Sequence, residues 1–229
     1  TLGEMFGLAA AYGRLGRMDE QLALAERVYR LRREVLEPGH PDIAESAGNL
    51  AAAYLEAGRP ADGLAMNQAW LQALRRQQPP DDREQLRALN NLAVIYGELG
   101  RETEAQALHE QMVERATRLM GRAHPWTLGS LANLAAGHRR AGRLPQALAL
   151  QQEVWQLRRQ ARGERHPETL EAMLDVGRSL RELGRLDEAL AILEPCHAGL
   201  QAALGERHAA TLAAQLERGI AASAAGRSD

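Results

Sequence analysis

Apolar and polar residues alternate along the chain with the spacing of amphipathic helices. Within residues 42–56 the apolar side chains lie three or four residues apart, which places them on one face of a helix. They are Ile43, Ala47, Leu50, Ala51 and Tyr54. A second apolar pattern follows after a Gly-Arg pair and contains a triplet such as Leu22-Ala23-Leu24. The pattern predicts two kinds of helix in alternation, helix A before the Gly-Arg pair and helix B after it.

This pair of helices recurs at an interval of 42 residues, without insertion or deletion. Two series of landmarks share the interval: the glycine of each Gly-Arg pair, and the residue expected just before each later A helix. The first series is Gly16, Gly58, Gly100, Gly142, Gly184 and Gly226; the second is His40, Asp82, His124, His166 and His208. A constant interval of this length is typical of a solenoid, in which each unit buries its apolar face against its neighbours.

We therefore predict an all-α protein, a right-handed α–α superhelix of about eleven antiparallel helices that forms a single array over residues 1–229. The first helix is expected at about 1–15 and the last at about 210–224. The predicted units are about 1–39, 40–81, 82–123, 124–165 and 166–207, followed by a terminal helix in 208–229.

Several residues are expected to define the helix ends. The His or Asp of the second series is placed to cap an A helix, with a proline or an acidic residue in the first turn. Gly121, Gly163 and Gly205 are expected to close B helices in the left-handed conformation. Pro195 should kink the last B helix, and Gln77-Gln78-Pro79-Pro80 replaces the usual junction between units.

The two ends of the array differ. The chain opens in the middle of a unit, which suggests that it continues a longer protein. The last A helix carries polar residues or glycine where earlier copies bury apolar groups, and this predicts a polar cap of the kind that solenoids need for solubility. These residues are Thr211, Gln215, Arg218 and Gly219. An unfinished sixth unit is the alternative.

Composition excludes several classes of protein. A net charge of −2 gives no electrostatic footprint for nucleic acid or an anionic membrane, and no apolar run is long enough to span a bilayer. The sequence contains no lysine, which a Walker-type phosphate loop or a Schiff-base enzyme requires. The single cysteine, Cys196, excludes an internal disulfide framework and favours a reducing compartment, so we expect a cytoplasmic protein.

No pattern in the sequence predicts catalysis. Hydrolase, kinase and dinucleotide motifs are absent, and the histidines of the second series occupy equivalent positions in successive units. Such positions are separated by a helix-packing distance of roughly 8–10 Å, whereas zinc ligands lie about 2 Å from the metal. We expect these histidines to cap helices, and we expect no metal, no other cofactor and no enzymatic activity.

The stretch Leu89-Asn90-Asn91-Leu92-Ala93-Val94-Ile95-Tyr96, together with His124-Pro125 and Gly163-Glu164-Arg165-His166-Pro167-Glu168-Thr169-Leu170, resembles the 42-residue tetratricopeptide repeat of the kinesin light chain type. The resemblance covers the whole chain. It implies a superhelix whose A helices line a concave groove that holds extended peptides or partner proteins. Such arrays also occur in bacterial multidomain regulators, beside kinase or nucleotide-switch domains.

Candidate contacts lie on the face of the A helices opposite the core. At about 100° per residue, positions 45, 49, 52 and 56 form a stripe there. The second position of the stripe is Asn49, Asn91 or Asn133 in successive units, and then Asp175. A column of asparagines is suited to bonding the main chain of an extended peptide, and we include the adjacent Asn90. Alternatively, the asparagines bond neighbouring helices and stabilise the stack.

Arginines on or beside the same stripe are candidates for binding acidic groups, because guanidinium recognises carboxylate and phosphate in a bidentate manner. Four of them are expected to converge: Arg139, Arg140, Arg178 and Arg181. Arg87 lies on the stripe in an earlier unit. The alternative is a solvated face that Glu182 partly neutralises.

Three tryptophans and one histidine complete the candidates. Trp70 and Trp155 lie at packing positions of B helices and are expected in the core. Trp126 lies in the first turn of an A helix, where it either forms an exposed contact beside the groove or packs on the preceding helix. His138 replaces a tyrosine and is expected in the core or at the groove edge.

The sequence thus predicts a non-enzymatic scaffold that binds a protein or an extended peptide in its groove, acidic peptides among the candidates, with no role for nucleic acid or membrane. A second hypothesis is a sensing or autoinhibitory module of a larger bacterial regulator, in which the groove contacts other domains of the same parent chain. A third is self-association through the ends of the array.

Overall fold

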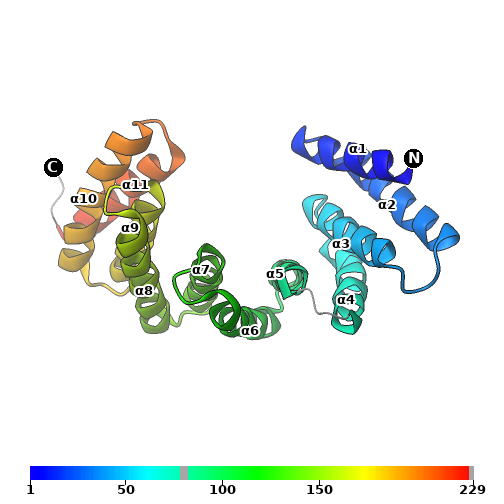
Figure 1. The fold of residues 1–229 in the computed structure, drawn as a ribbon. Helices are drawn as coiled ribbons and strands as arrows, with labels where there is room; N and C mark the ends of the chain where they lie inside the picture. Colours follow the sequence, from blue (N-terminus) through cyan, green and yellow to red (C-terminus); the bar gives the residue numbers. More distant parts are fainter. Residues whose placement is uncertain (78–81, 227–229) are drawn as a thin grey trace. The chain divides into compact units, whose positions relative to one another are not determined.

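The structure is a computed structural model that describes residues 1–77 and 82–226. All eleven helices in these ranges are α-helices, and no strand is present there (Figure 1). They are α1 (Leu2–Arg14), α2 (Met18–Val35), α3 (Pro41–Glu56), α4 (Pro60–Arg76), α5 (Asp82–Glu98), α6 (Glu102–Met120), α7 (Pro125–Arg140), α8 (Leu144–Arg162), α9 (Pro167–Glu182), α10 (Leu186–Leu204) and α11 (Ala209–Ala224). The odd-numbered helices are the predicted A helices and the even-numbered ones the B helices, so the all-α repeat fold is confirmed.

The chain divides into two compact units, Thr1–Met112 and Val113–Asp229, with the boundary inside α6. In the first unit each helix from α1 to α5 packs on the next, and α3 also contacts α5. In the second, each helix from α7 to α11 packs on the next, and α9 also contacts α11. A helices therefore pack mainly on the B helices beside them, and one pair of successive A helices in each unit also meets, α3 with α5 and α9 with α11. A single continuous array over residues 1–229 stays a prediction.

Histidine caps begin four of the A helices, as predicted. Nδ1 of His40, His124, His166 and His208 accepts the backbone N–H two residues later, with a nitrogen–nitrogen distance of 3.2 Å in each case. Asp82, the one member of the series that is not a histidine, is the first residue of α5 and not the residue before it. The junction predicted at Gln77–Pro80 lies, apart from Gln77, outside the described residues.

Two of the predicted glycine caps differ from the prediction in one respect. Gly163 ends α8 with φ 87° and ψ 166°, and Gly205 ends α10 with φ 88° and ψ 165°. The positive φ requires glycine, as expected, but the extended ψ places both residues outside the left-handed helical region. Pro195 lies inside α10, which continues on both sides of it over Leu186–Leu204.

The buried contact between A and B helices uses side chains of compensating size. In α3, a Cβ atom on Gly48 would lie 2.5 Å from the ring of Trp70 in α4, which is 4% exposed. The equivalent residues of the third later helix pair, α9 and α10, are Leu174 and Cys196, and both belong to one buried cluster. A large B side chain faces a glycine in one pair, and a small B side chain accompanies a leucine in the other. Trp70 is thus a core residue, as predicted, and Trp155 is half-buried against two clusters.

The polar cap predicted for the last helix is wrong. Thr211 is buried, and its hydroxyl donates to the carbonyl oxygen of Gly205 at 2.8 Å. Gln215, Arg218 and Gly219 are exposed, but they share the surface of α11 with Leu212, Leu216 and Ile220, which are also exposed. Polar residues at some positions of α11 do not bury the apolar residues that lie between them.

The compensation in size yields a prediction for stability. Gly48→Leu should lower the free energy of unfolding by about 1–3 kcal/mol through overpacking against Trp70, and Trp70→Cys should lower it by about 3–5 kcal/mol by leaving a cavity. The double variant Gly48→Leu/Trp70→Cys reproduces the pair Leu174 and Cys196, so its loss should be clearly smaller than the sum. Urea unfolding followed by circular dichroism measures all three.

The matched control is Gly129→Leu in α7, because a Cβ atom at Gly129 meets nothing within 4 Å and helix propensity favours leucine over glycine. Additive losses in the double variant would show that the two side chains do not compensate each other.

Candidate functional site

The predicted stripe lies on the A helices of both units. Its second position is occupied by Asn49 on α3, Asn91 on α5, Asn133 on α7 and Asp175 on α9. Three of these side chains are half-buried, and Asn133 is exposed. Asn90, beside Asn91, is also half-buried. The repeat interval thus brings the same position of each A helix to a partly accessible surface.

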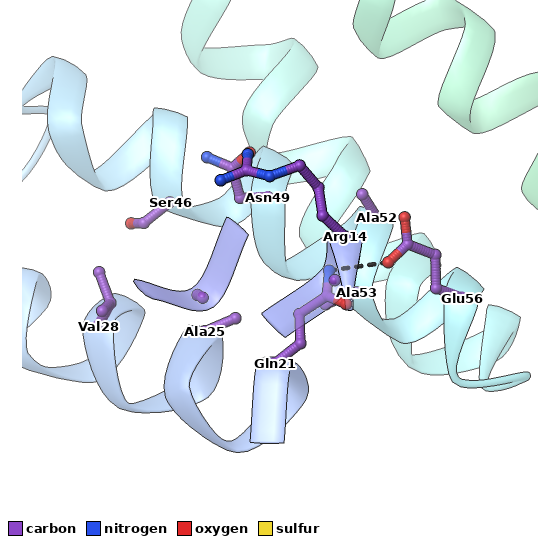
Figure 2. Close-up of a pocket in the computed structure, with 11 residues that line it drawn as sticks. Arg14, Gln21, Ala25, Val28, Ser46, Asn49, Ala52, Ala53 and Glu56 are labelled. Atoms are coloured by element: carbon purple, nitrogen blue, oxygen red, sulfur yellow. Dashed lines mark hydrogen bonds between the residues drawn. The ribbon is translucent and has the colours of Figure 1, made fainter. Parts of the chain in front are cut away.

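In the first unit the stripe borders a cavity of about 390 Å³ between α1, α2 and α3 (Figure 2). Small apolar side chains line much of it, including Ala25, Val28 and Ala53. Polar and charged residues also line it: Arg14, Gln21, Ser46, Asn49 and Glu56. A partly apolar cavity with a few polar groups is typical of sites that hold a side chain or small ligand.

Gln21 shapes this cavity and departs from the repeat. The other B helices carry Gly63, Ala105, Ala147 and Ala189 at the equivalent position. Its Nε2 donates to the Glu56 carboxylate at 2.7 Å. Its amide fits because Gly13 lies opposite: a Cβ atom on Gly13 would approach Gln21 Oε1 to 2.8 Å. Periodicity within one unit does not distinguish Gly13, Arg14 or Gln21, but comparison of the B helices at the interval of 42 residues reveals the substitution at Gln21.

Asn49 presents its amide to the cavity. Its Nδ2 donates to the carbonyl oxygen of Glu45 at 3.0 Å, within α3 itself. An asparagine amide has two N–H donors and one carbonyl acceptor, so this bond uses only part of its capacity. The described bond does not join two helices, as the alternative interpretation of the asparagine column would require.

The second unit carries a chain of ion pairs on the same face. Arg139 on α7 donates to Glu182 on α9 at 3.1 Å, and Arg181 lies 3.6 Å from the same carboxylate. Arg181 and Arg178 then bind the two carboxylate oxygens of Glu217 on α11, at 2.6 and 2.9 Å. Arg178 also donates to Asp175 at 3.2 Å. The pairs connect three successive A helices, and we call these six residues the ion-pair chain.

Burial and the nearby arginines act in opposite senses on the pKa values of two acids in the ion-pair chain, Glu217 and Asp175. Burial raises the pKa of Glu217, but the hydrogen bonds from Arg178 and Arg181 more than offset it, so the pKa lies below its ordinary value. Burial also raises the pKa of Asp175, and here the nearby Arg178 and Arg139 do not fully compensate. Glu217 is therefore the stronger charged partner of the arginines.

The ion-pair chain contains three of the four arginines that were expected to converge on an acidic ligand. Arg139, Arg178 and Arg181 are already paired with carboxylates of the protein, so an acidic ligand would have to compete with Glu182 and Glu217. Arg140 ends α7 and is exposed. Glu217 was missed, although it stands 42 residues after Asp175 and continues the asparagine column.

The remaining candidates are distributed over the two units. Arg87 on α5 pairs with Glu84 at 2.7 Å and lies 5.8 Å from the centroid of the Trp70 ring. Trp126 is 40% exposed in the first turn of α7, so a contact role for it stays a prediction. His138 is half-buried and accepts a hydrogen bond from Nε of Arg143 at 3.0 Å.

The described residues contain neither a metal-type cluster nor an activated thiol. No group of three or more His, Cys, Asp or Glu side chains there has the arrangement of a metal site. The Cys196 thiol is buried, and burial raises its pKa to about 12, so it is not activated as a nucleophile. None of the helices described has the length and apolar character needed to traverse a bilayer.

The tetratricopeptide repeat family model matches residues 1–76, 84–154 and 129–197. The chain belongs to the tetratricopeptide repeat family. No curated protein is significantly similar to this tetratricopeptide repeat chain in sequence. Among solved structures, a putative kinesin light chain from Podosopora anserina with nearly identical repeats is 24% identical, with a TM-score of 0.79 over 88% of this chain and 95% of that one.

Two regulatory proteins have similar folds. The quorum sensor NprR from B. thuringiensis, in its apo form, is 16% identical, with a TM-score of 0.74 over 97% of this chain and 59% of that one. A signal transduction ATPase from Pyrococcus horikoshii with a tetratricopeptide repeat sensor is 13% identical, with a TM-score of 0.76 over 100% of this chain and 34% of that one. At these identities the similarities establish the fold alone, a tetratricopeptide repeat solenoid.

The ion-pair chain predicts a pH dependence of stability in this tetratricopeptide repeat protein. Glu217→Gln should lower the free energy of unfolding by about 1.5–3 kcal/mol at pH 6, because it removes the charge that Arg178 and Arg181 bind. Because the folded pKa of Glu217 is depressed, this contribution is complete above its unfolded pKa of about 4.3 and is lost as the pH falls through the folded value. Urea unfolding of wild type and variant between pH 6 and acid conditions measures the difference.

Asp175 has a raised pKa and changes stability in the opposite sense, so only the difference between wild type and variant isolates Glu217. Glu164→Gln is the control: Glu164 pairs with Arg159 but its side chain is 75% exposed, and its loss should stay within about 0.5 kcal/mol. A difference for Glu217→Gln that does not shrink at low pH would contradict the assignment.

Proposed function

We propose that this protein is a non-enzymatic interaction module that binds an extended peptide, or an extended segment of a partner protein, on its A helices. The observation that carries the proposal is the cavity of the first unit. There Asn49 lies among small apolar side chains, and its amide uses only part of its hydrogen-bonding capacity. Extended ligands gain affinity from main-chain hydrogen bonds and specificity from pockets for alternate side chains. A cavity beside an asparagine column supplies both kinds of contact.

Asn49 and Asn91 are the proposed main-chain contacts of the first unit. They lie 42 residues apart on α3 and α5, and those two helices contact each other directly. Asparagine amides bond main-chain groups without reading side chains, so this part of the site is expected to tolerate different sequences. In the second unit, Asn133 on α7 and Asp175 on α9 occupy the same position of their A helices.

Arginines that already bind carboxylates of the protein are poor candidates for binding an acidic group of the ligand. In the second unit three of the arginines are neutralised by the ion-pair chain. In the first unit Arg14 lines the cavity, and in Figure 2 its side chain points away from Glu56. We therefore place the acid-binding contact of the ligand at Arg14, with Glu56 and Gln21 at the other side of the cavity.

Binding of a selected peptide tests this function. A phage library of random linear peptides is panned on the protein, and the affinity of the selected peptide is measured by fluorescence anisotropy. Asn49→Ala/Asn91→Ala should weaken binding by roughly tenfold or more, since each lost hydrogen bond contributes about 1 kcal/mol. Arg14→Gln should weaken binding and reduce its dependence on salt.

Gln68→Ala is the matched control, because Gln68 is an exposed amide on the B helix α4; its affinity should match that of wild type. Unchanged affinity in the folded asparagine double variant would remove the column from the mechanism. Failure to select any peptide in repeated panning would count against the proposed function as a whole.

A second candidate is a sensing or autoinhibitory module. It is favoured by the similar fold of the tetratricopeptide repeat sensor in the Pyrococcus ATPase, of which this chain covers 34%. In that case the bound segment is supplied by another domain of the same polypeptide. The complete reading frame of the gene separates the two candidates, since a polypeptide with no further domain would exclude the second.

A further inference from the structure

The cavity of the first unit lies where the B helix carries an unusually small residue. Ala25 on α2 lines this cavity. The four later B helices carry larger residues at the equivalent position, and all of them are buried: Asn67, His109, Gln151 and Leu193. A side chain of the protein therefore occupies this place in every later helix pair, whereas α2 supplies only a methyl group there.

Asn67 shows which acceptor a polar side chain at this place can reach. Its Nδ2 donates to the carbonyl oxygen of Ala88 on α5, the next A helix, at 2.8 Å. The residue equivalent to Ala88 is Ser46 on α3, and Ser46 lines the cavity together with Ala25 (Figure 2). A backbone carbonyl oxygen has two lone pairs, so it can accept this bond in addition to the bond within its own helix. In the first unit the protein supplies no counterpart of Asn67 for the carbonyl oxygen of Ser46.

Leu193 shows the other side of the same place. A Cβ atom on Gly177 of α9 would lie 2.5 Å from the Leu193 side chain, so a residue at this position also packs on the A helix of its own pair. The residue equivalent to Gly177 is Ala9 on α1, which lines the cavity as well. The cavity therefore includes the volume that a B-helix side chain fills in the later pairs.

We propose that an amide side chain of the bound segment, glutamine or asparagine, enters this cavity and takes the place that Asn67 takes in the next helix pair. Its NH₂ group donates to the carbonyl oxygen of Ser46, and its methylene groups lie against Ala9 and Ala25. Within the proposed function, on which this amide pocket rests, Asn49 binds the main chain of the same segment. The amide pocket adds a preference for one ligand side chain, which is how extended peptides gain specificity.

The polar atoms of the cavity favour an amide over other side chains. Besides the carbonyl oxygen of Ser46, Oε1 of Gln21 is buried and accepts no hydrogen bond from the described residues. A carboxylate or a hydrocarbon side chain has no donor for these oxygens, and a buried acceptor without a donor is costly. A lysine or arginine would share the cavity with the guanidinium group of Arg14, and none of the four equivalent positions carries a permanent cation. An amide supplies two N–H donors without charge.

Peptides selected on the wild-type protein test the amide pocket. Sequences from the random library should share a glutamine or asparagine at one position. In the tightest-binding peptide this glutamine is replaced by methionine, or this asparagine by leucine, which keeps the size of the side chain and removes its N–H donors. The affinity measured by fluorescence anisotropy should fall at least about fivefold, because the carbonyl oxygen of Ser46 loses the donor from the ligand. Replacement by lysine should weaken binding as well.

Ala25→Asn tests the place of the amide pocket by filling it with the residue of the next B helix. The introduced side chain should occupy the cavity, so the selected peptide and its methionine or leucine counterpart should bind this variant with affinities equal within about twofold. Ala23→Asn is the matched control, because Ala23 is exposed on the same helix α2. This control should keep the wild-type difference between the two peptides, and circular dichroism establishes that both variants are folded.

Selected peptides that depend on Asn49 but share no amide residue would overturn the amide pocket and leave the proposed function intact. The same holds for peptides that bind equally well with methionine, leucine or lysine at the shared position, and for a folded Ala25→Asn variant that still distinguishes the two peptides. If no peptide can be selected, the proposed function fails and the amide pocket with it. If Ala25→Asn does not fold, the comparison of peptides on wild type decides alone.

Discussion

Burial of A helices by the B helices beside them is the interaction on which this structure depends. No helix has a core of its own, because each carries an apolar face that only a neighbour removes from water. The 42-residue interval keeps those faces in register, and the histidine caps and positive-φ glycines set the start and end of helices within it. Gly48 with Trp70, and Leu174 with Cys196, fill the same contact with opposite distributions of volume. The register is therefore conserved along the chain while the individual side chains vary.

Because shared positions are used for packing, the surface features with binding potential arise where one unit differs from the others. Gln21 stands where the other B helices have glycine or alanine, and with Gly13 opposite it shapes the cavity of the first unit. In the second unit the asparagine column gives way to Asp175 and Glu217, which bind the arginines beside them. The same stripe of equivalent positions thus borders an amide-lined cavity in one unit and carries the ion-pair chain in the other.

The sequence predicted the helices and their order, since a strict interval and two series of landmarks constrain every unit at once. It predicted the surface less well. Periodicity identifies the stripe on which Arg139, Arg178 and Arg181 lie, but only the packed structure shows that their guanidinium groups reach carboxylates on the same and on adjacent A helices. The polar cap failed for a related reason: substitutions at Gln215 and Arg218 do not determine whether Leu212 and Leu216 find cover. Pairing between helices depends on how far each side chain reaches, and hydrophobic periodicity gives only the face of the helix on which that side chain lies.

The ion-pair chain has a consequence for how molecules approach the second unit. Its three guanidinium groups and three carboxylates cancel in total charge, so they project little field beyond the first layers of solvent. Electrostatic steering, which accelerates encounters between oppositely charged surfaces, gains nothing from these six groups. The ion-pair chain should therefore contribute little to the dependence of association rates on ionic strength at that part of the surface.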